Sequence, residues 1–168
     1  MNVFQSVTAS VLASFLVACS LPTASGDVLE RLNPLDGAAR VELYALRPEP
    51  ARLAPAGDRT REFHGYEVLG EAALTDPALA TQLARLISRG VAENDGSAAL
   101  CFNPRHGVRV VRDGHTLDLV ICYECMQIYV YDPHVTNPNG FETWLTTQSV
   151  EPDVTRIFEG LGLTLAPN

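Results

Sequence analysis

The feature that most constrains this chain is a short turn between two alternating apolar runs, in the stretch "HGVRVVRDGHTLDLVICY". Asp113-Gly114 is typical of the two-residue type I′ turn that connects neighbouring antiparallel strands. Such a turn fixes which residues of the two strands lie opposite each other. The predicted pairs are Arg112 with His115, Val110 with Leu117, Val108 with Leu119, Arg109 with Asp118, and His106 with Ile121. One face of this hairpin is then apolar, and the charged pair lies on the other face.

The second strand loses its pattern at the motif CYEC, residues 122–125. Before the motif, odd-numbered positions carry the apolar side chains of the core face; after it, even-numbered positions carry them. A regular strand keeps one parity along its length, so the sequence predicts a bulge or bend at this motif.

Two helices have clear start and stop signals. In the first, at 76–90, Asp76 supplies an N-cap, Pro77 suits the first helical position, and Gly90 ends the helix. Apolar residues recur at helical spacing between these ends. A second helix is expected at about 152–160.

Shorter strands are expected at 41–46 and 64–75, with a loop at 47–62 between them. We therefore expect a single α+β domain. Its antiparallel sheet is centred on a hairpin at 99–131 and is packed by the two helices.

The first nineteen residues have the features of an export signal. Val7–Ala18 is an uncharged, mostly apolar run, shorter than the about 20 helical residues that cross a bilayer. The end of this run together with the next residue, Leu16-Val17-Ala18-Cys19, resembles a bacterial lipobox. This resemblance implies cleavage before Cys19, a diacylglycerol on its sulfur, and an acyl group such as palmitate on its new amine.

The same resemblance divides the chain into a signal peptide (1–18), a lipid-anchored tether (19–40) and the α+β domain (41–168). Three acyl chains exceed the two signals that stable membrane anchoring requires. Ser20 after the cysteine implies sorting to the periplasmic face of the outer membrane. The membrane, bound through the lipid, is the expected partner.

The charge of the chain bears on its other partners. The formal net charge is −8, and all twelve basic residues are arginines dispersed along the sequence. Nucleic-acid binding needs a basic patch or stripe, so nucleic acid is not an expected partner.

Cys101, Cys122 and Cys125 remain once Cys19 is lipidated. Exported compartments are oxidising, so a disulfide is expected, and an odd number of cysteines leaves one thiol over. The structural interpretation pairs Cys101 with Cys125 or Cys122, ties the open end of the hairpin, and leaves the third thiol buried and inert.

Two alternatives use the same residues. Cys101, His106, Cys122 and Cys125 form a Cys₃His set suited to Zn²⁺, and the neighbouring Met126 would suit Cu(I). Otherwise no cofactor is expected. Thiol catalysis is the second alternative, although a strand follows CYEC, and thioredoxin-type cysteines lie at a helix N-terminus.

The segment "CFNPRHGVRV…ICYEC" resembles a block in uncharacterised secreted or lipid-anchored bacterial proteins, and this resemblance implies a small α+β domain. The function expected is a non-enzymatic binding or accessory module of the envelope. The alternatives are a metal-binding domain and a thiol-dependent enzyme. The remaining histidines, His64, His115 and His134, are expected to be solvated.

Overall fold

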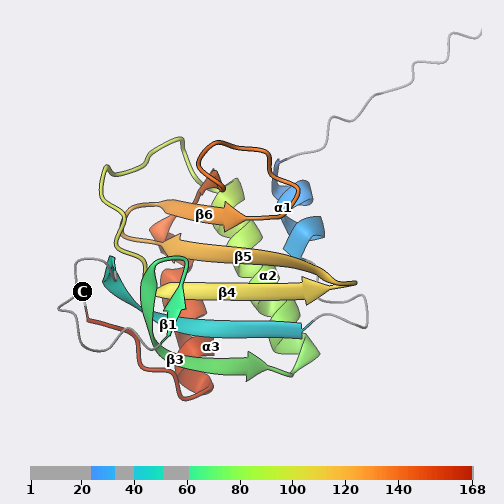
Figure 1. The fold of residues 1–168 in the computed structure, drawn as a ribbon, viewed down its shortest axis with the longest axis vertical. Helices are drawn as coiled ribbons and strands as arrows, with labels where there is room; N and C mark the ends of the chain where they lie inside the picture. The colour runs from blue at the N-terminus through green and yellow to red at the C-terminus, as the bar shows by residue number, and fades with distance from the viewer. Residues whose placement is uncertain (1–23, 33–39, 51–60, 168) are drawn as a thin grey trace, which may run out of the picture.

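The computed structural model describes residues 24–32, 40–50 and 61–167, which form a mixed α+β fold (Figure 1). One antiparallel sheet has the strand order β2-β3-β1-β4-β5-β6-β7. Its strands are β1 (Arg40–Pro50), β2 (Glu62–Phe63), β3 (Tyr66–Leu74), β4 (His106–Arg112), β5 (His115–Cys122), β6 (Gln127–Tyr131) and β7 (Glu142–Leu145). The helices are α1 (Ala24–Leu32), α2 (Pro77–Ala92) and α3 (Glu151–Gly160), the last preceded by a short 3-10 turn at Gln148–Val150.

The central hairpin has the predicted register. All five predicted pairs between β4 and β5 are present. Asp113 and Gly114 have φ angles of 50° and 80°, which are the left-handed values that a type I′ turn requires.

Two strand boundaries differ from the prediction. β4 begins only at His106, so residues 99–105 lie outside the sheet. β1 extends to Pro50, well into the expected loop, because it pairs with β3 beyond two register irregularities. The remainder of that expected loop, 51–60, lies outside the described residues.

A helix lies within the segment expected to be a tether. The sequence indicated one helical turn there, at 28–32, and the structure has helix α1 over residues 24–32. Val28 and Leu32 are only 3% and 2% exposed in the core, and Arg31 forms ion pairs with Asp132 and Glu142. The folded part therefore starts at least as early as residue 24.

The main core lies between the helices and one face of the sheet. The apolar face of the central hairpin packs here against all three described helices, with Ile87, Val154 and Phe158 among the buried helical residues. Asp76 caps α2 as predicted, since its side chain accepts hydrogen bonds from the N–H groups of Ala78 and Leu79. In the described part of the chain, no helix has the length and apolar character needed to cross a membrane.

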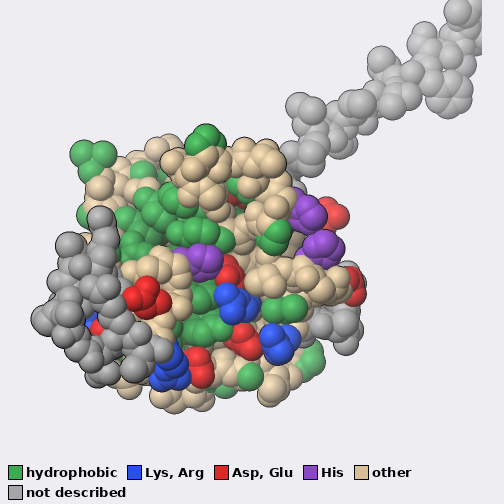
Figure 2. All heavy atoms as spheres, in the orientation of Figure 1, with side chains coloured by type: hydrophobic (Ala, Val, Ile, Leu, Met, Phe, Trp, Pro, Cys, Tyr) green, Lys and Arg blue, Asp and Glu red, His purple; other side chains and the backbone are tan. Residues whose placement is uncertain are grey.

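A smaller apolar cluster covers the opposite face of the sheet. Phe63, from the short hairpin β2–β3, stacks on Tyr44 of β1. Gly107 makes room for it, because a Cβ at this position would lie 3.0 Å from the Phe63 ring. Figure 2 shows that charged and histidine side chains share this face with hydrophobic ones.

Candidate functional site: three sulfur atoms at the end of the central strands

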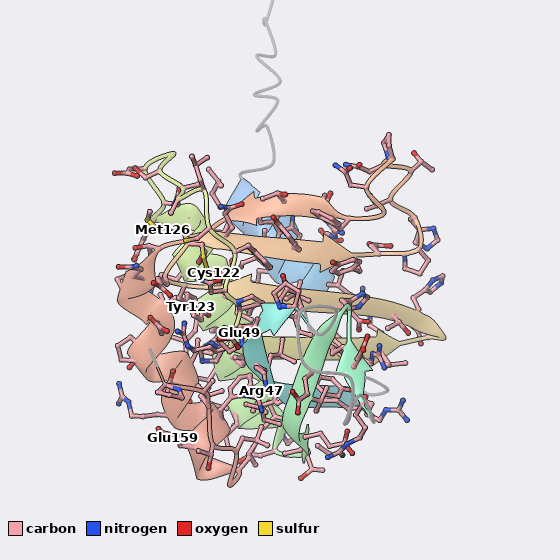
Figure 3. All side chains as sticks on the ribbon, turned by 60° about the vertical axis from the view of Figure 1, so that its left-hand side comes forward. Arg47, Glu49, Cys122, Tyr123, Met126 and Glu159 are labelled. Atoms are coloured by element: carbon pink, nitrogen blue, oxygen red, sulfur yellow. A yellow bond between two sulfur atoms is a disulfide. The ribbon has the colours of Figure 1, made fainter. Side chains whose placement is uncertain are left out.

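The CYEC motif forms the connection between β5 and β6. Cys122 is the last residue of β5, and it pairs with Gln127 at the start of β6. The Met126 N–H donates to the Tyr123 carbonyl at 3.0 Å, and Met126 has a φ of 57°. The predicted change of parity is therefore a full chain reversal between two strands; Figure 3 labels Cys122, Tyr123 and Met126 at this end of the sheet.

The reversal brings Cys122 and Cys125 together as a disulfide. Their Cα atoms lie 5.2 Å apart, within the usual range for a disulfide, and their sulfur atoms are 2.06 Å apart. Cys101 is a free, exposed cysteine. The predicted pairing of Cys101 and the predicted burial of the third thiol are thus wrong.

Cys101 nevertheless lies against the disulfide, on the side of Cys125. The thiol of Cys101 donates to Cys125 Sγ at 3.1 Å. This distance is shorter than the about 3.5–4.0 Å between two carbon atoms in van der Waals contact, although sulfur is larger than carbon. The third sulfur is therefore in direct contact with one end of the disulfide.

Two backbone N–H groups also point at the disulfide. The Asn103 N–H donates to Cys125 Sγ at 3.3 Å and to Cys122 Sγ at 3.4 Å. The Cys125 N–H donates to Cys122 Sγ at 3.1 Å. Cys122 Sγ thus accepts from two N–H groups, and such donors stabilise negative charge on the atom they face.

The segment that carries Cys101 is tied to the chain reversal from both sides. The Ala99 N–H donates to the Cys125 carbonyl at 3.0 Å, and the Gln127 side chain donates to the Ala99 carbonyl at 2.5 Å. Further on, the Leu46 N–H donates to the Arg105 carbonyl at 3.0 Å. These bonds hold Cys101 in place although residues 99–105 form no strand.

Arg105 links the motif to the C-terminal segment. Its guanidinium donates to Glu124 of CYEC at 3.2 Å and to the Pro167 carbonyl at 3.2 Å. The Gln148 side chain donates to the Glu124 carbonyl at 3.2 Å. The reversal is therefore fixed from outside the hairpin, a feature that the spacing of the cysteines did not indicate.

His106 does not join the sulfur atoms. It is buried in the helical face, bonded to Thr155 at 3.1 Å and flanked by the rings of Tyr123 and Phe158. Burial, with a smaller contribution from Arg105, lowers the pKa of His106 to about 3, so the imidazole is neutral. The predicted Cys₃His set is not brought together, and the described residues hold no group of three His, Cys, Asp or Glu side chains arranged for a metal.

A second polar cluster lies on the face of the sheet opposite the helices. The sequence predicted its Arg109–Asp118 pair but not the contact of His64. Arg109 donates two hydrogen bonds to Asp118, at 2.8 and 2.7 Å, as the register implied. His64, which was expected to be solvated, lies 2.7 Å from the same carboxylate and stacks on Tyr131. Burial alone would raise the pKa of Asp118, but the hydrogen bonds from Arg109 and His64 outweigh it and lower the pKa.

The sequence does contain a signal for the position of His64. His64-Gly65 is a two-residue turn between short strands, with φ angles of 50° and 84°, like Asp113-Gly114 in the central hairpin. The last two histidines, His115 and His134, are exposed, with ring nitrogens 3.1 Å apart. Cys19 lies outside the described residues.

Comparison with known proteins adds no assignment: no family model, no curated protein and no solved structure matches this chain.

Proposed function

We propose that this chain is a lipid-anchored protein at the periplasmic face of the outer membrane, and that its exported domain is an accessory module for thiol–disulfide exchange. The anchor rests on the lipobox resemblance that ends at Cys19. One observation carries the exchange: the free Cys101 Sγ lies 3.1 Å from Cys125 Sγ of a closed disulfide.

Thiol–disulfide exchange needs a thiolate that can reach a disulfide sulfur. The sequence alone favours a non-enzymatic binding module, partly because a strand follows CYEC. In the exchange proposed here the attacking sulfur is Cys101, which lies outside the Cys-x-x-Cys motif. A helix after the motif is therefore not required.

The partner class follows from the oxidised state of the motif. A closed disulfide accepts two electrons from a dithiol, which is itself converted to a disulfide. In an exported compartment, proteins with two neighbouring cysteines supply such dithiols. We therefore propose envelope proteins with paired thiols as the substrates.

The test uses the full chain in detergent and a synthetic peptide with two cysteines, in anaerobic buffer without another oxidant. We expect one peptide disulfide to form per chain, while the free thiols of the protein, counted in denaturant, rise by two. A chain of the same length with Cys122→Ser and Cys125→Ser is the control and should oxidise no peptide. A wild-type chain that oxidises no peptide either would contradict the proposed function.

Metal binding is a second candidate, favoured by the two N–H donors to Cys122 Sγ. After reduction, Cys101, Cys122 and Cys125 would offer three thiolates, which are ligands that Cu(I) prefers. We expect one Cu(I) per reduced chain and none per oxidised chain, measured by metal analysis after gel filtration. Equal copper in both forms would exclude these sulfur atoms as the site.

The anchor has a separate test. Cys19→Ala should abolish incorporation of labelled palmitate and release the protein from the membrane fraction. Ser20→Ala is the matched control and should leave both unchanged. A Cys19→Ala chain that still incorporates the label would contradict the lipid anchor.

A further inference from the structure

The disulfide lies where a partner cannot reach it directly. Cys122 and Cys125 are 1% and 0% exposed, whereas Cys101 is exposed. Exchange requires contact between the attacking sulfur and a disulfide sulfur. Among the cysteines in the described part of the chain, only Cys101 is therefore open to a partner protein.

We propose that Cys101 relays electrons to the buried disulfide through an internal exchange in which Cys125 is the shared sulfur. The Cys101 thiolate attacks Cys125 Sγ, the Cys101–Cys125 bond forms, and the Cys122–Cys125 bond breaks. Cys122 leaves as a thiolate with the electron pair and takes up, through solvent, the proton that Cys101 lost. The step consumes no oxidant or reductant, since one thiol and one disulfide are present before and after it.

The contacts favour this direction of attack. Cys101 Sγ contacts Cys125 Sγ, so Cys125 is the sulfur under attack. The leaving sulfur, Cys122 Sγ, already accepts hydrogen bonds from the N–H groups of Asn103 and Cys125. Donors placed before the reaction at the atom that gains charge stabilise the transition state without reorganisation.

The exchange produces two forms of the same oxidation level. In the form shown by the structure, the disulfide is buried and the free thiol of Cys101 is exposed. In the other form, the disulfide is exposed at Cys101 and the free thiol is at buried Cys122. Only this second form offers a disulfide sulfur to a partner.

The reaction with a partner dithiol follows from the second form and rests on the proposed function. One partner thiolate attacks Cys101 Sγ and releases Cys125 as a thiolate. The other partner thiolate then attacks the partner sulfur of this mixed disulfide and releases Cys101. The partner gains a disulfide, and the protein holds three thiols, so two electrons have moved from the partner to the protein.

Thiol mapping of the unmodified full chain provides the first test. The chain is quenched in acid, denatured, alkylated and digested, and the alkylated cysteine is identified by mass spectrometry. We expect the label on Cys101 or on Cys122 in separate molecules, and none on Cys125, because Cys125 belongs to both disulfides. Label on Cys125 in oxidised chains, or on Cys101 alone in every molecule, would overturn the relay.

Three serine variants of the full chain give the second test. Cys122→Ser should form the Cys101–Cys125 disulfide and oxidise the two-cysteine peptide at least as fast as the wild-type chain. Cys101→Ser should keep the buried disulfide and react at least tenfold more slowly. Cys125→Ser should retain free thiols at Cys101 and Cys122, because the shared sulfur is missing.

These outcomes separate the relay from the proposed function. If Cys101→Ser oxidises the peptide as fast as the wild-type chain, exchange is retained and the relay is wrong. If Cys122→Ser forms the Cys101–Cys125 disulfide but neither this variant nor the wild type oxidises the peptide, the internal chemistry stands and the proposed function is wrong. A disulfide between Cys101 and Cys122 in Cys125→Ser also overturns the relay.

Discussion

Two polar clusters depend on strand β5, one at Cys122 and one four residues earlier at Asp118. Both connect β5 to segments that are distant in sequence. The carboxylate of Asp118 is 6% exposed and has Arg109 and His64 as partners. The sulfur cluster, by contrast, contains a closed disulfide and an exposed thiol in contact with it.

The Asp118 cluster stabilises the fold, whereas the sulfur cluster has the contacts needed for a reaction. Arg109 and His64 both bond to the buried carboxylate of Asp118, so a change at either residue removes a partner from a buried charge. The disulfide joins residues only three apart in sequence, so it removes little freedom from the unfolded chain. A Cys101–Cys125 disulfide would close a longer loop and would stabilise the fold more.

The largest expected effect is at Asp118. Asp118→Ala should lower the free energy of unfolding by about 3 kcal/mol, because Arg109 and His64 lose their buried partner. We expect a value at the low end of the range for broken buried ion pairs, since the Arg109 side chain is 34% exposed. Denaturant unfolding measures it. Glu71→Ala is the control, because its pair with Arg61 is more than half exposed, and it should change stability by less than about 1 kcal/mol. Equal effects of the two variants would contradict a structural role for the Asp118 cluster.

Reduction of the disulfide should lower the free energy of unfolding by less than Asp118→Ala does. Because the loop is short, we expect the free energy of unfolding to fall by on the order of 2 kcal/mol when the Cys122–Cys125 bond is reduced. The measurement is urea unfolding with and without a dithiol reductant, in the Cys101→Ser background so that only one bond is involved. A loss larger than that of Asp118→Ala would show that the sulfur cluster is mainly structural and would break the comparison.

As the pH falls, the fold should lose stability through His106 before the carboxylate of Asp118 is protonated. The folded pKa of His106 is lowered to about 3 by burial, whereas an unfolded histidine binds a proton below about pH 6.5. The unfolded chain therefore binds more protons between these values, and stability falls as the pH falls. We expect a loss of about 1–2 kcal/mol between pH 6.5 and pH 5, measured by urea unfolding.

A matched variant identifies the titrating group. His134→Gln changes an exposed histidine and should retain this pH dependence, whereas His106→Gln should lose most of it. Asp118 contributes at lower pH, because its pKa is lowered and its stabilisation is lost only as the pH falls toward that value. A flat profile in the wild-type chain above pH 5 would contradict the buried, neutral His106.

The smallest expected effect is at Tyr123, between the two disulfide cysteines. Within the described part of the chain its buried hydroxyl has no hydrogen-bond partner, and an unsatisfied buried hydroxyl is unfavourable. Tyr123→Phe should therefore change the free energy of unfolding by less than about 1 kcal/mol, in the stabilising direction, and leave peptide oxidation unchanged. A loss of peptide oxidation would extend the reactive cluster to this residue.

The sequence predicted the parts of the fold that depend on local rules. The Asp113-Gly114 turn and the alternating pattern determine the register of β4 and β5, and this register places Arg109 opposite Asp118. Capping chemistry determined the start of α2 at Pro77. The hairpin register alone does not place Cys101 beside Cys125, because residues 99–105 form no strand and are held by other hydrogen bonds.

The parts that could not be predicted depend on contacts between distant segments. A change of parity at CYEC is consistent with a bulge, a bend or a reversal, and only the pairing of β6 with β5 distinguishes them. The Asn103 N–H lies against the sulfur atoms because residues 99–105 are held by β6 and β1. His64 reaches Asp118 only because the β2–β3 hairpin lies over Gly107.

Helix α1 has a consequence for where exchange could take place. Arg31 of α1 contacts Asp132, directly after β6, so the helix lies beyond the end of β6 that is remote from the cysteines (Figure 1). If Cys19 carries the lipid, the chain from Cys19 to Ala24 spans at most about 18 Å. The domain, and the exposed thiol of Cys101 with it, would then be confined to a thin layer at the membrane surface. Lateral diffusion in that layer, more than diffusion through the periplasm, would determine which proteins meet the thiol.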